Sequence, residues 1–104
     1  MYGDDIIFGK CYEVVTGYQV GEDEPVLLEL IPGHRYEIHY GIHQGIYIYE
    51  GVVVDNETNR KNHPHSIGSH MFRNEKTGEL SFGYYGHTSP SEFTRIVRHI
   101  NKQQ

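Results

Sequence analysis

Apolar and polar residues alternate along the middle of the chain, which is the pattern of half-buried β-strands. In residues 35–40, Tyr36, Ile38 and Tyr40 fall on one face, and charged or polar residues fall on the other. Residues 46–54 read as a second, longer strand. The connection between the two segments is short and bounded by glycines, so we predict that they pair as an antiparallel hairpin.

Four further segments have the composition of strands. Residues 11–15 and 26–31 are separated by an acidic turn that contains glycine and proline. Residues 69–73 and 79–84 flank the connection 74–78, which ends in glycine. Each of these two pairs is therefore predicted to form a hairpin.

A polar segment and a helix complete the pattern. Residues 55–68 hold Asn, Thr, His, Pro and Gly, and we expect them to form a long surface loop. Ser89 and Glu92 have the spacing of a capping box, with Pro90 in the first turn. The helix that follows is predicted to be amphipathic, because its apolar residues recur at helical spacing: Phe93, Ile96, Val97 and Ile100.

These elements predict a mainly β (α+β) fold, a small antiparallel β barrel or half-barrel of five to six strands with one C-terminal amphipathic helix. The length of 104 residues suits one domain, so residues 1–104 are expected to fold as a single unit. The single cysteine, Cys11, permits no internal disulfide, and the apolar runs are too short to span a membrane. We therefore expect a cytoplasmic protein that is not associated with a membrane.

The formal net charge of −5 is unevenly distributed along the chain. Residues 1–52 carry nine acids and two bases, whereas residues 53–104 carry five acids and seven bases. Nucleic-acid binding depends on Lys and Arg that neutralise phosphates, so the charge disfavours a nucleic-acid partner. An acidic surface instead suits a basic protein partner.

The segment from Pro32-Gly33 to Asp55 resembles the lecithin retinol acyltransferase and NlpC/P60-like group of thiol enzymes. In that group a Pro-Gly turn precedes a strand, and a His-x-Gly-Ile-Tyr-like strand leads through a Gly turn to Val-Val-His. The register fits without a gap from His43 to Asp55. The resemblance implies that His43 is a general base and that Asp55 orients its ring, at a place where the family usually has histidine.

The nucleophile departs from the family pattern. The family's cysteine lies at a helix N-terminus downstream of these strands, and no cysteine follows position 11 here. Ser91, before Glu92, occupies the nearest comparable place. Because a serine hydroxyl forms its anion less readily than a thiol, the resemblance implies a compact or degenerate relative of these enzymes.

A second resemblance is to SH3-like and KOW-type barrels, which also show Pro-Gly, a short alternating strand, spaced glycines and a Gly-Val-Val strand. The basic residues of the nucleic-acid-binding members are missing, which favours a protein-binding barrel. Tyrosine is favoured at interfaces for its large rigid ring and polar tip. If the central hairpin carries tyrosine on both faces, one face is a candidate binding surface formed by Tyr36, Tyr40, Tyr47 and Tyr49.

Eight histidines raise a metal hypothesis. His63, His65 and His70 lie close in sequence, and His39 and His43 could add to them. Their spacing matches no established metal site, so we expect solvated histidines and no metal or other cofactor.

The leading hypothesis is a non-enzymatic domain that binds a protein partner through the tyrosine-bearing face and the acidic first half. An acyltransferase-like or hydrolase-like enzyme that uses His43, Asp55 and Ser91, and a histidine-loop metal-binding protein, remain the alternatives. An exposed strand edge could also pair with a second copy of the chain.

Overall fold

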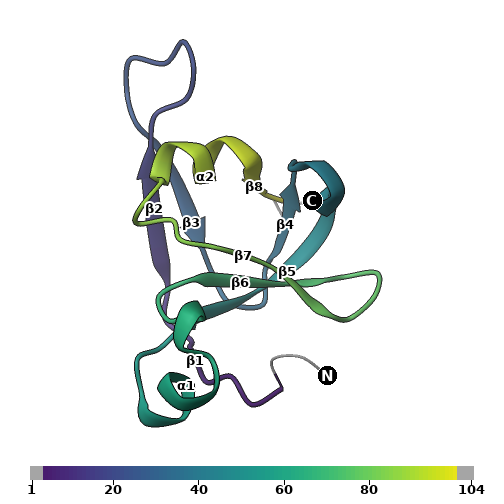
Figure 1. Ribbon diagram of the computed structural model, residues 1–104. Coiled ribbons are helices and arrows are strands. Elements are labelled where there is room, and N and C mark those ends of the chain that lie inside the picture. The colour runs from purple at the N-terminus through teal and green to yellow at the C-terminus, as the bar shows by residue number, and fades with distance from the viewer. Residues whose placement is uncertain (1–3, 101–104) are drawn as a thin grey trace.

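The computed structural model describes residues 4–100, which form a mainly β fold (Figure 1). The strands are β1 (Phe8–Gly9), β2 (Glu13–Gly17), β3 (Val26–Leu30), β4 (Arg35–Ile38), β5 (Gly45–Val53), β6 (His70–Asn74), β7 (Leu80–Tyr84) and β8 (Val97–His99). The helical segments are α1 (Glu57–Asn62), α2 (Pro90–Ile96) and two 3-10 turns, η1 (Gly41–His43) and η2 (Pro64–Ser66).

The strands belong to two antiparallel sheets. The larger sheet has the order β7-β6-β5-β4-β8, and β1 pairs with β5 at its side; the smaller sheet is the hairpin of β2 and β3. All three predicted hairpins are confirmed by these pairings. The mainly β, antiparallel class is therefore confirmed. The larger and smaller sheets do not close into a barrel, because no strand pairing joins them within residues 4–100.

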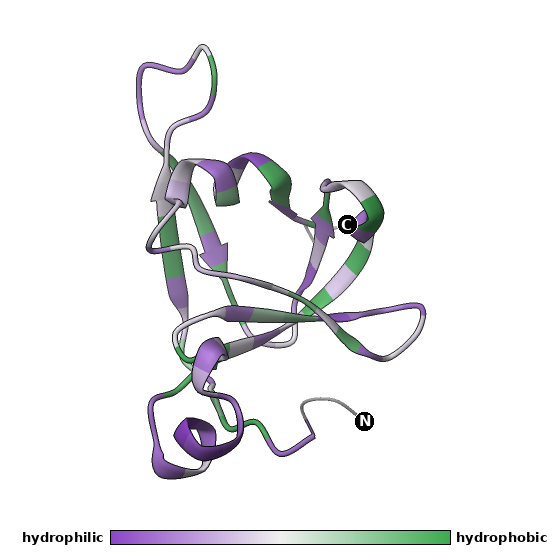
Figure 2. Cartoon of the chain, viewed as in Figure 1, coloured by the Kyte–Doolittle hydropathy of each residue, from purple (hydrophilic) through white to green (hydrophobic). Residues whose placement is uncertain are grey.

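The principal core lies where the two sheets and α2 meet. Burial alternates along β2 and β3, so that Val15, Leu28 and Leu30 face inward while their neighbours are exposed. Figure 2 shows the same alternation of hydrophobic and hydrophilic segments along the strands. The buried cluster comprises Val15, Leu28, Leu30, Tyr36, Ile38, Tyr47, Tyr49, Phe72, Phe82, Phe93 and Val97.

The C-terminal helix is shorter than predicted. It ends at Ile96, and Val97 then begins β8 and pairs with Ile38 of β4. Pairing of the β-branched Val97 with β4 buries it in the core, which outweighs the continuation of the helical stripe. None of the helices within residues 4–100 is long and apolar enough to cross a membrane.

The predicted capping box is not formed. Ser89 stands at the N-cap of α2, but its side chain makes no cap hydrogen bond. The Glu92 carboxylate instead accepts a hydrogen bond from the Tyr84 hydroxyl at 2.6 Å. The Glu92 side chain thus links the first turn of α2 to β7 and does not cap the helix.

Residues 55–68 contain α1 and η2, whereas the sequence predicted a surface loop. Asn56 caps α1 by accepting a hydrogen bond from the Asn59 N–H at 2.8 Å. The Asn59 side chain is fully buried. It forms hydrogen bonds with the backbone of Ile7, which precedes β1, and of Val54, which follows β5. Its Oδ1 accepts from Ile7 N at 3.1 Å, and its Nδ2 donates to Ile7 O at 2.9 Å and to Val54 O at 2.8 Å.

An Asn59→Ala variant is expected to lose about 2 kcal/mol of unfolding free energy, because three hydrogen bonds disappear and backbone groups of Ile7 and Val54 lose their partner. Urea denaturation measures the loss. Asn62→Ala is the matched control, since that side chain makes only an exposed hydrogen bond to Asp5. An equal loss in the two variants would contradict the role assigned to Asn59.

Side chains join the two sheets where strand pairing does not. The Tyr36 hydroxyl donates to Glu29 O at 2.6 Å and accepts from Ile31 N at 2.9 Å. Burial raises the pKa of Tyr36 to about 12, so the hydroxyl keeps its proton. The hairpin is also joined to α2, because the N–H of Tyr18 donates to Ser91 Oγ at 2.9 Å.

Candidate functional site

His43 and Asp55 lie beyond opposite ends of β5. The chain between them does not turn at Gly51 but runs on as one strand, with a bulge between Tyr49 and Gly51. At about 3.3 Å per residue, the ends of this strand are separated by a distance on the order of 25 Å. The structure therefore does not bring the imidazole and the carboxylate together.

Each of these residues, and Ser91, has other neighbours. The His43 ring lies 5.4 Å from that of Phe82, and Asp55 forms an ion pair with Arg60 at 3.4 Å. Ser91 Oγ accepts the hydrogen bond from Tyr18 N. No hydrogen bond in the described part of the chain joins Ser91 to His43. The arrangement that the acyltransferase resemblance implies is thus not assembled.

The predicted tyrosine face is largely inside the protein. Tyr36 is the cross-strand partner of Tyr47, so both lie on the same side of the sheet. Tyr36, Tyr47 and Tyr49 are at most 2% exposed. The prediction of a tyrosine binding surface is wrong for these three, because they face the core. Tyr40 is exposed, and its ring stacks with that of His43.

The histidines of the metal hypothesis have separate environments. His63 binds Asp5 through Nε2 at 2.7 Å, and this hydrogen bond lowers the pKa of Asp5. His65 is exposed in η2, whereas His70 is buried at the start of β6. Within residues 4–100, no group of three or more His, Cys, Asp or Glu side chains is placed to hold a metal ion.

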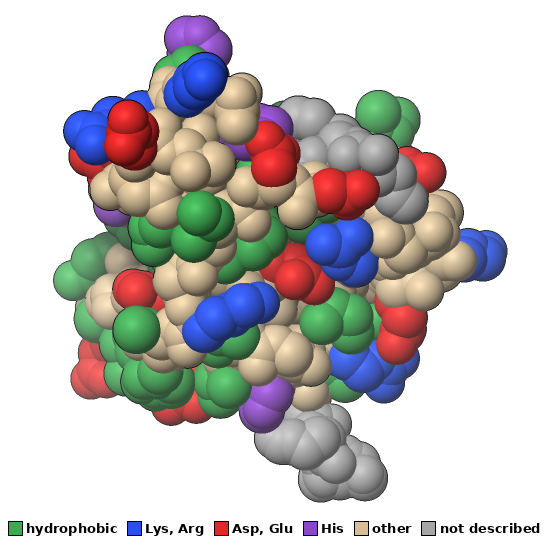
Figure 3. Space-filling view, turned by 90° about the horizontal axis from the view of Figure 1, so that it is seen from below, with side chains coloured by type: hydrophobic (Ala, Val, Ile, Leu, Met, Phe, Trp, Pro, Cys, Tyr) green, Lys and Arg blue, Asp and Glu red, His purple; other side chains and the backbone are tan. Residues whose placement is uncertain are grey.

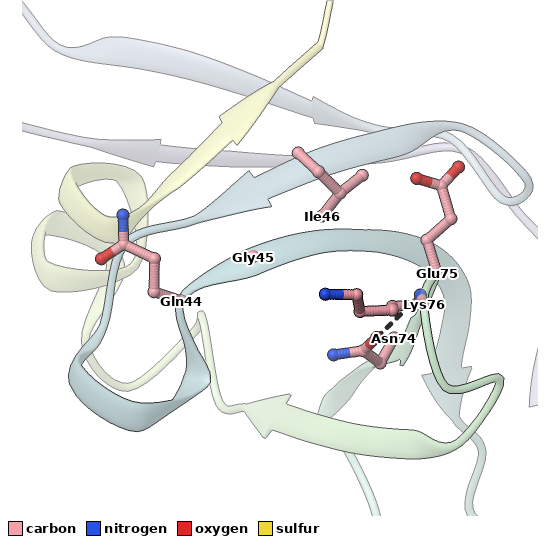
Figure 4. Close-up of a pocket in the computed structure, with 6 residues that line it drawn as sticks. All are labelled: Gln44, Gly45, Ile46, Asn74, Glu75 and Lys76. Carbon is pink, nitrogen blue, oxygen red and sulfur yellow. Dashed lines mark hydrogen bonds between the residues drawn. The ribbon is translucent and has the colours of Figure 1, made fainter.

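A hollow of about 480 Å³ lies beside the start of β5 and the β6–β7 turn (Figure 4). Its polar groups are already engaged in the local structure. Asn74 Oδ1 accepts from Lys76 N at 2.8 Å, and Glu75 binds Arg35 at 2.9 Å. Gln44 lies at the opposite end of the hollow from Glu75. The polar side chains around this hollow do not converge on one point. They stabilise the β6–β7 turn and its contact with β4, so the hollow does not have the features of a binding site.

The outer face of the β2–β3 hairpin carries exposed apolar side chains. We define this outer face by Tyr12, Val14, Tyr18, Val20 and Leu27, which are 44–86% exposed. Figure 3 shows hydrophobic side chains gathered at the left of the molecule, the side on which Figure 1 places β2 and β3. Acidic residues accompany them: Glu13, Glu22, Asp23, Glu24 and Glu29. Residues 11–34 contain no Lys or Arg, so the hairpin is an apolar surface with an acidic surround.

A second hollow, of about 370 Å³, lies beside β2, and we call it the His70 hollow. Its lining consists of Glu13, Val14, Val15, Thr16, His70, Gly86, His87 and Pro90. His70 is the buried polar side chain in this lining, 7% exposed. Its Nδ1 lies 2.9 Å from the hydroxyl of Tyr49, which is fully buried.

The protonation state of His70 follows from these contacts. Burial lowers the pKa of His70 to about 4, and the nearby His87 adds to this effect, so the ring is neutral at physiological pH. Burial also raises the pKa of Tyr49. A buried phenol proton needs an acceptor, and Nδ1 of His70 is the one within reach. We therefore assign the ring proton to Nε2, which makes the ring a hydrogen-bond donor at that atom.

Sequence reasoning missed both surfaces of the hairpin. The metal hypothesis places His70 with the loop histidines His63 and His65, although His70 lies within the predicted strand 69–73. The signal for the outer face was present in the alternation of Val14 and Leu27 with buried neighbours, within a stretch that has no basic residue. Comparison with models of protein families, with curated proteins and with solved structures finds no match to the chain.

Proposed function

We propose that this protein is a non-enzymatic interaction domain that binds a basic, partly apolar segment of a partner protein through the outer face of the β2–β3 hairpin. The observation that carries the proposal is the exposure of five apolar side chains on one hairpin that has acidic residues and no base. Grouped exposed apolar side chains with a polar rim are typical of protein-binding sites.

Charge selects among partners. Glu22, Asp23 and Glu24 are exposed in the β2–β3 connection, and Glu29 is exposed on β3 itself. Opposite charge across an interface speeds association and excludes partners of like charge. A segment in which Lys or Arg alternates with aliphatic residues therefore fits both features of the hairpin.

Selection from a random dodecapeptide display library tests the proposal. Enriched peptides are expected to combine Lys or Arg with aliphatic or aromatic residues. A Leu27→Ser variant should bind them at least about tenfold more weakly, because burial of a leucine side chain contributes about 1.5–3 kcal/mol. Ile42→Ser is the matched control, since Ile42 is 95% exposed on η1 rather than on the hairpin. Equal binding by both variants, or no enrichment, would refute the proposal.

A further inference from the structure

The edge of β2 that faces away from β3 has free backbone groups. The Tyr36 hydroxyl binds Glu29 O of β3 and the N–H of Ile31, which follows β3, so both groups point away from β2. Opposed residues of an antiparallel pair either exchange both backbone hydrogen bonds or exchange neither. Because Val14 is the register partner of Glu29, Val14 also directs its N–H and C=O away from β3.

The backbone of Tyr18 is consistent with this direction. Tyr18 follows Val14 by four residues, so its N–H also points away from β3, and it donates to Ser91 Oγ of α2. Thr16 precedes Tyr18 by two residues, so its backbone groups face the same side. Neither Val14 nor Thr16 has a backbone partner on that side within the described residues. The free edge of β2 therefore offers N–H donors and C=O acceptors in alternation.

The His70 hollow lies beside this edge. Four consecutive residues of β2 line it and no residue of β3 does, which places it on the unpaired side. A side chain at Gly86 would narrow it, since an added Cβ would lie 3.3 Å from His70 Nε2 and 3.2 Å from Val15 Cγ2. The glycine thus keeps Nε2 open to the hollow. Nε2 has no hydrogen-bond partner among residues 4–100.

We propose that an extended, basic peptide segment of the partner protein adds to β2 as a strand, pairs with Val14 and Thr16, and places one carbonyl oxygen on His70 Nε2. This inference rests on the proposed function and specifies how the partner is held. Strand addition supplies affinity through backbone hydrogen bonds. A neutral N–H donor suits an amide carbonyl, and Glu13 in the lining suits a lysine or arginine of the added strand.

The probe is an acetylated, amidated heptapeptide of alternating lysine and valine, added at about 1 mM to the isotopically labelled full chain, a concentration that detects weak binding. Hydrogen exchange at the amides of Val14 and Thr16 is expected to slow, and the His70 Nε2–H resonance is expected to shift. The same peptide with every residue N-methylated has no backbone N–H on either edge, so it cannot form the ladder of an added strand. It should bind at least about tenfold more weakly.

Two glycine variants locate the site on the protein. Gly86→Ala should weaken binding of the heptapeptide at least about fivefold, because the added methyl group narrows access to Nε2. Gly83→Ala is the matched control, since the close contact of its new methyl group is with the flexible side chain of Met71, and His70 O lies at an ordinary contact distance of 3.7 Å. If Gly86→Ala does not fold, the comparison of the two peptides decides the question.

The outcomes separate this inference from the proposed function. Binding that is lost in Leu27→Ser but unaffected by N-methylation, with unchanged exchange at Val14 and Thr16, supports the outer face and overturns strand addition. The absence of any change at these amides and at His70 with the heptapeptide also overturns it. Slow exchange at these amides without peptide, in a dimer detected by sedimentation, would show that a second copy occupies the edge and would overturn the proposal.

Discussion

A Gly17→Ala variant is expected to lose about 3 kcal/mol or more of unfolding free energy. The added Cβ would lie 2.5 Å from Pro90 O and 2.7 Å from Ser91 Cα. Both atoms belong to the backbone of the first turn of α2, which cannot move aside as a side chain can. The helix must therefore shift away from β2, at the cost of overpacking and of the core contacts between them. Urea denaturation measures the change in midpoint.

Gly83→Ala is the control for Gly17→Ala. Its Cβ would also make a close contact, 2.6 Å from Met71 Sδ, but a methionine thioether can adopt another rotamer. We expect a loss of about 1 kcal/mol or less in this variant. Similar losses at the two positions would show that β2 and α2 do not pack as closely as the structure places them.

Lowering the pH from about 7 to about 4 is expected to reduce the unfolding free energy by about 3 kcal/mol through His70 alone. The pKa of His70 is about 4 in the folded state, against 6.5 in the unfolded chain. Between these values the unfolded chain binds a proton that the native ring does not. The contribution of His70 is therefore complete above pH 6.5 and is lost as the pH falls toward 4.

A His70→Gln variant removes this titration. Whatever its stability at pH 7, the difference between its stabilities at pH 7 and pH 4 should be about 3 kcal/mol smaller than in the wild type. His65→Gln is the matched control, because it makes the same substitution at an exposed position outside the core. Chemical denaturation at both pH values measures the differences, and an unchanged dependence in His70→Gln would contradict the burial of a neutral ring.

The hairpins could be predicted from the sequence because each depends on local information. Alternation along 35–40 and 46–54, with a short connection between them, specifies antiparallel neighbours without knowledge of the rest of the chain. The register across that hairpin is not local. It sets Tyr36 opposite Tyr47 and turns both toward the core, which the alternation within either strand could not reveal.

The sequence of the C-terminal segment is compatible with either a helix or a strand at Val97. Phe93 and Ile96 have helical spacing with Val97, but Val97 also suits a strand, and the open edge of β4 accepts it. The sequence shows the propensity of Val97 but not the availability of that edge. Tertiary pairing therefore decided where the helix ends.

The separation of His43 from Asp55 also depends on the backbone at Gly51. The family resemblance implies a Gly turn between them, whereas the pattern of residues 46–54 predicts one long strand, and the structure has the strand. In the structure Gly51 has a φ of 131°, and a Cβ there would lie 2.5 Å from Gly9 O. The residue is a glycine because the bulge of β5 and the close approach of β1 require it. One glycine can serve either purpose, and only the distant β1 distinguishes them.

The phenol of Tyr36 has a consequence for how the molecule responds to load. Between residues 4 and 100, no strand ladder joins the β2–β3 hairpin to the larger sheet; the hairpin is held by the Tyr36 hydroxyl, by hydrogen bonds from Tyr18 and Gln19 to α2, and by its buried side chains in the core. A force that separates the hairpin from the larger sheet must therefore expose Val15, Leu28 and Leu30, but it need not break any strand pairing within either sheet.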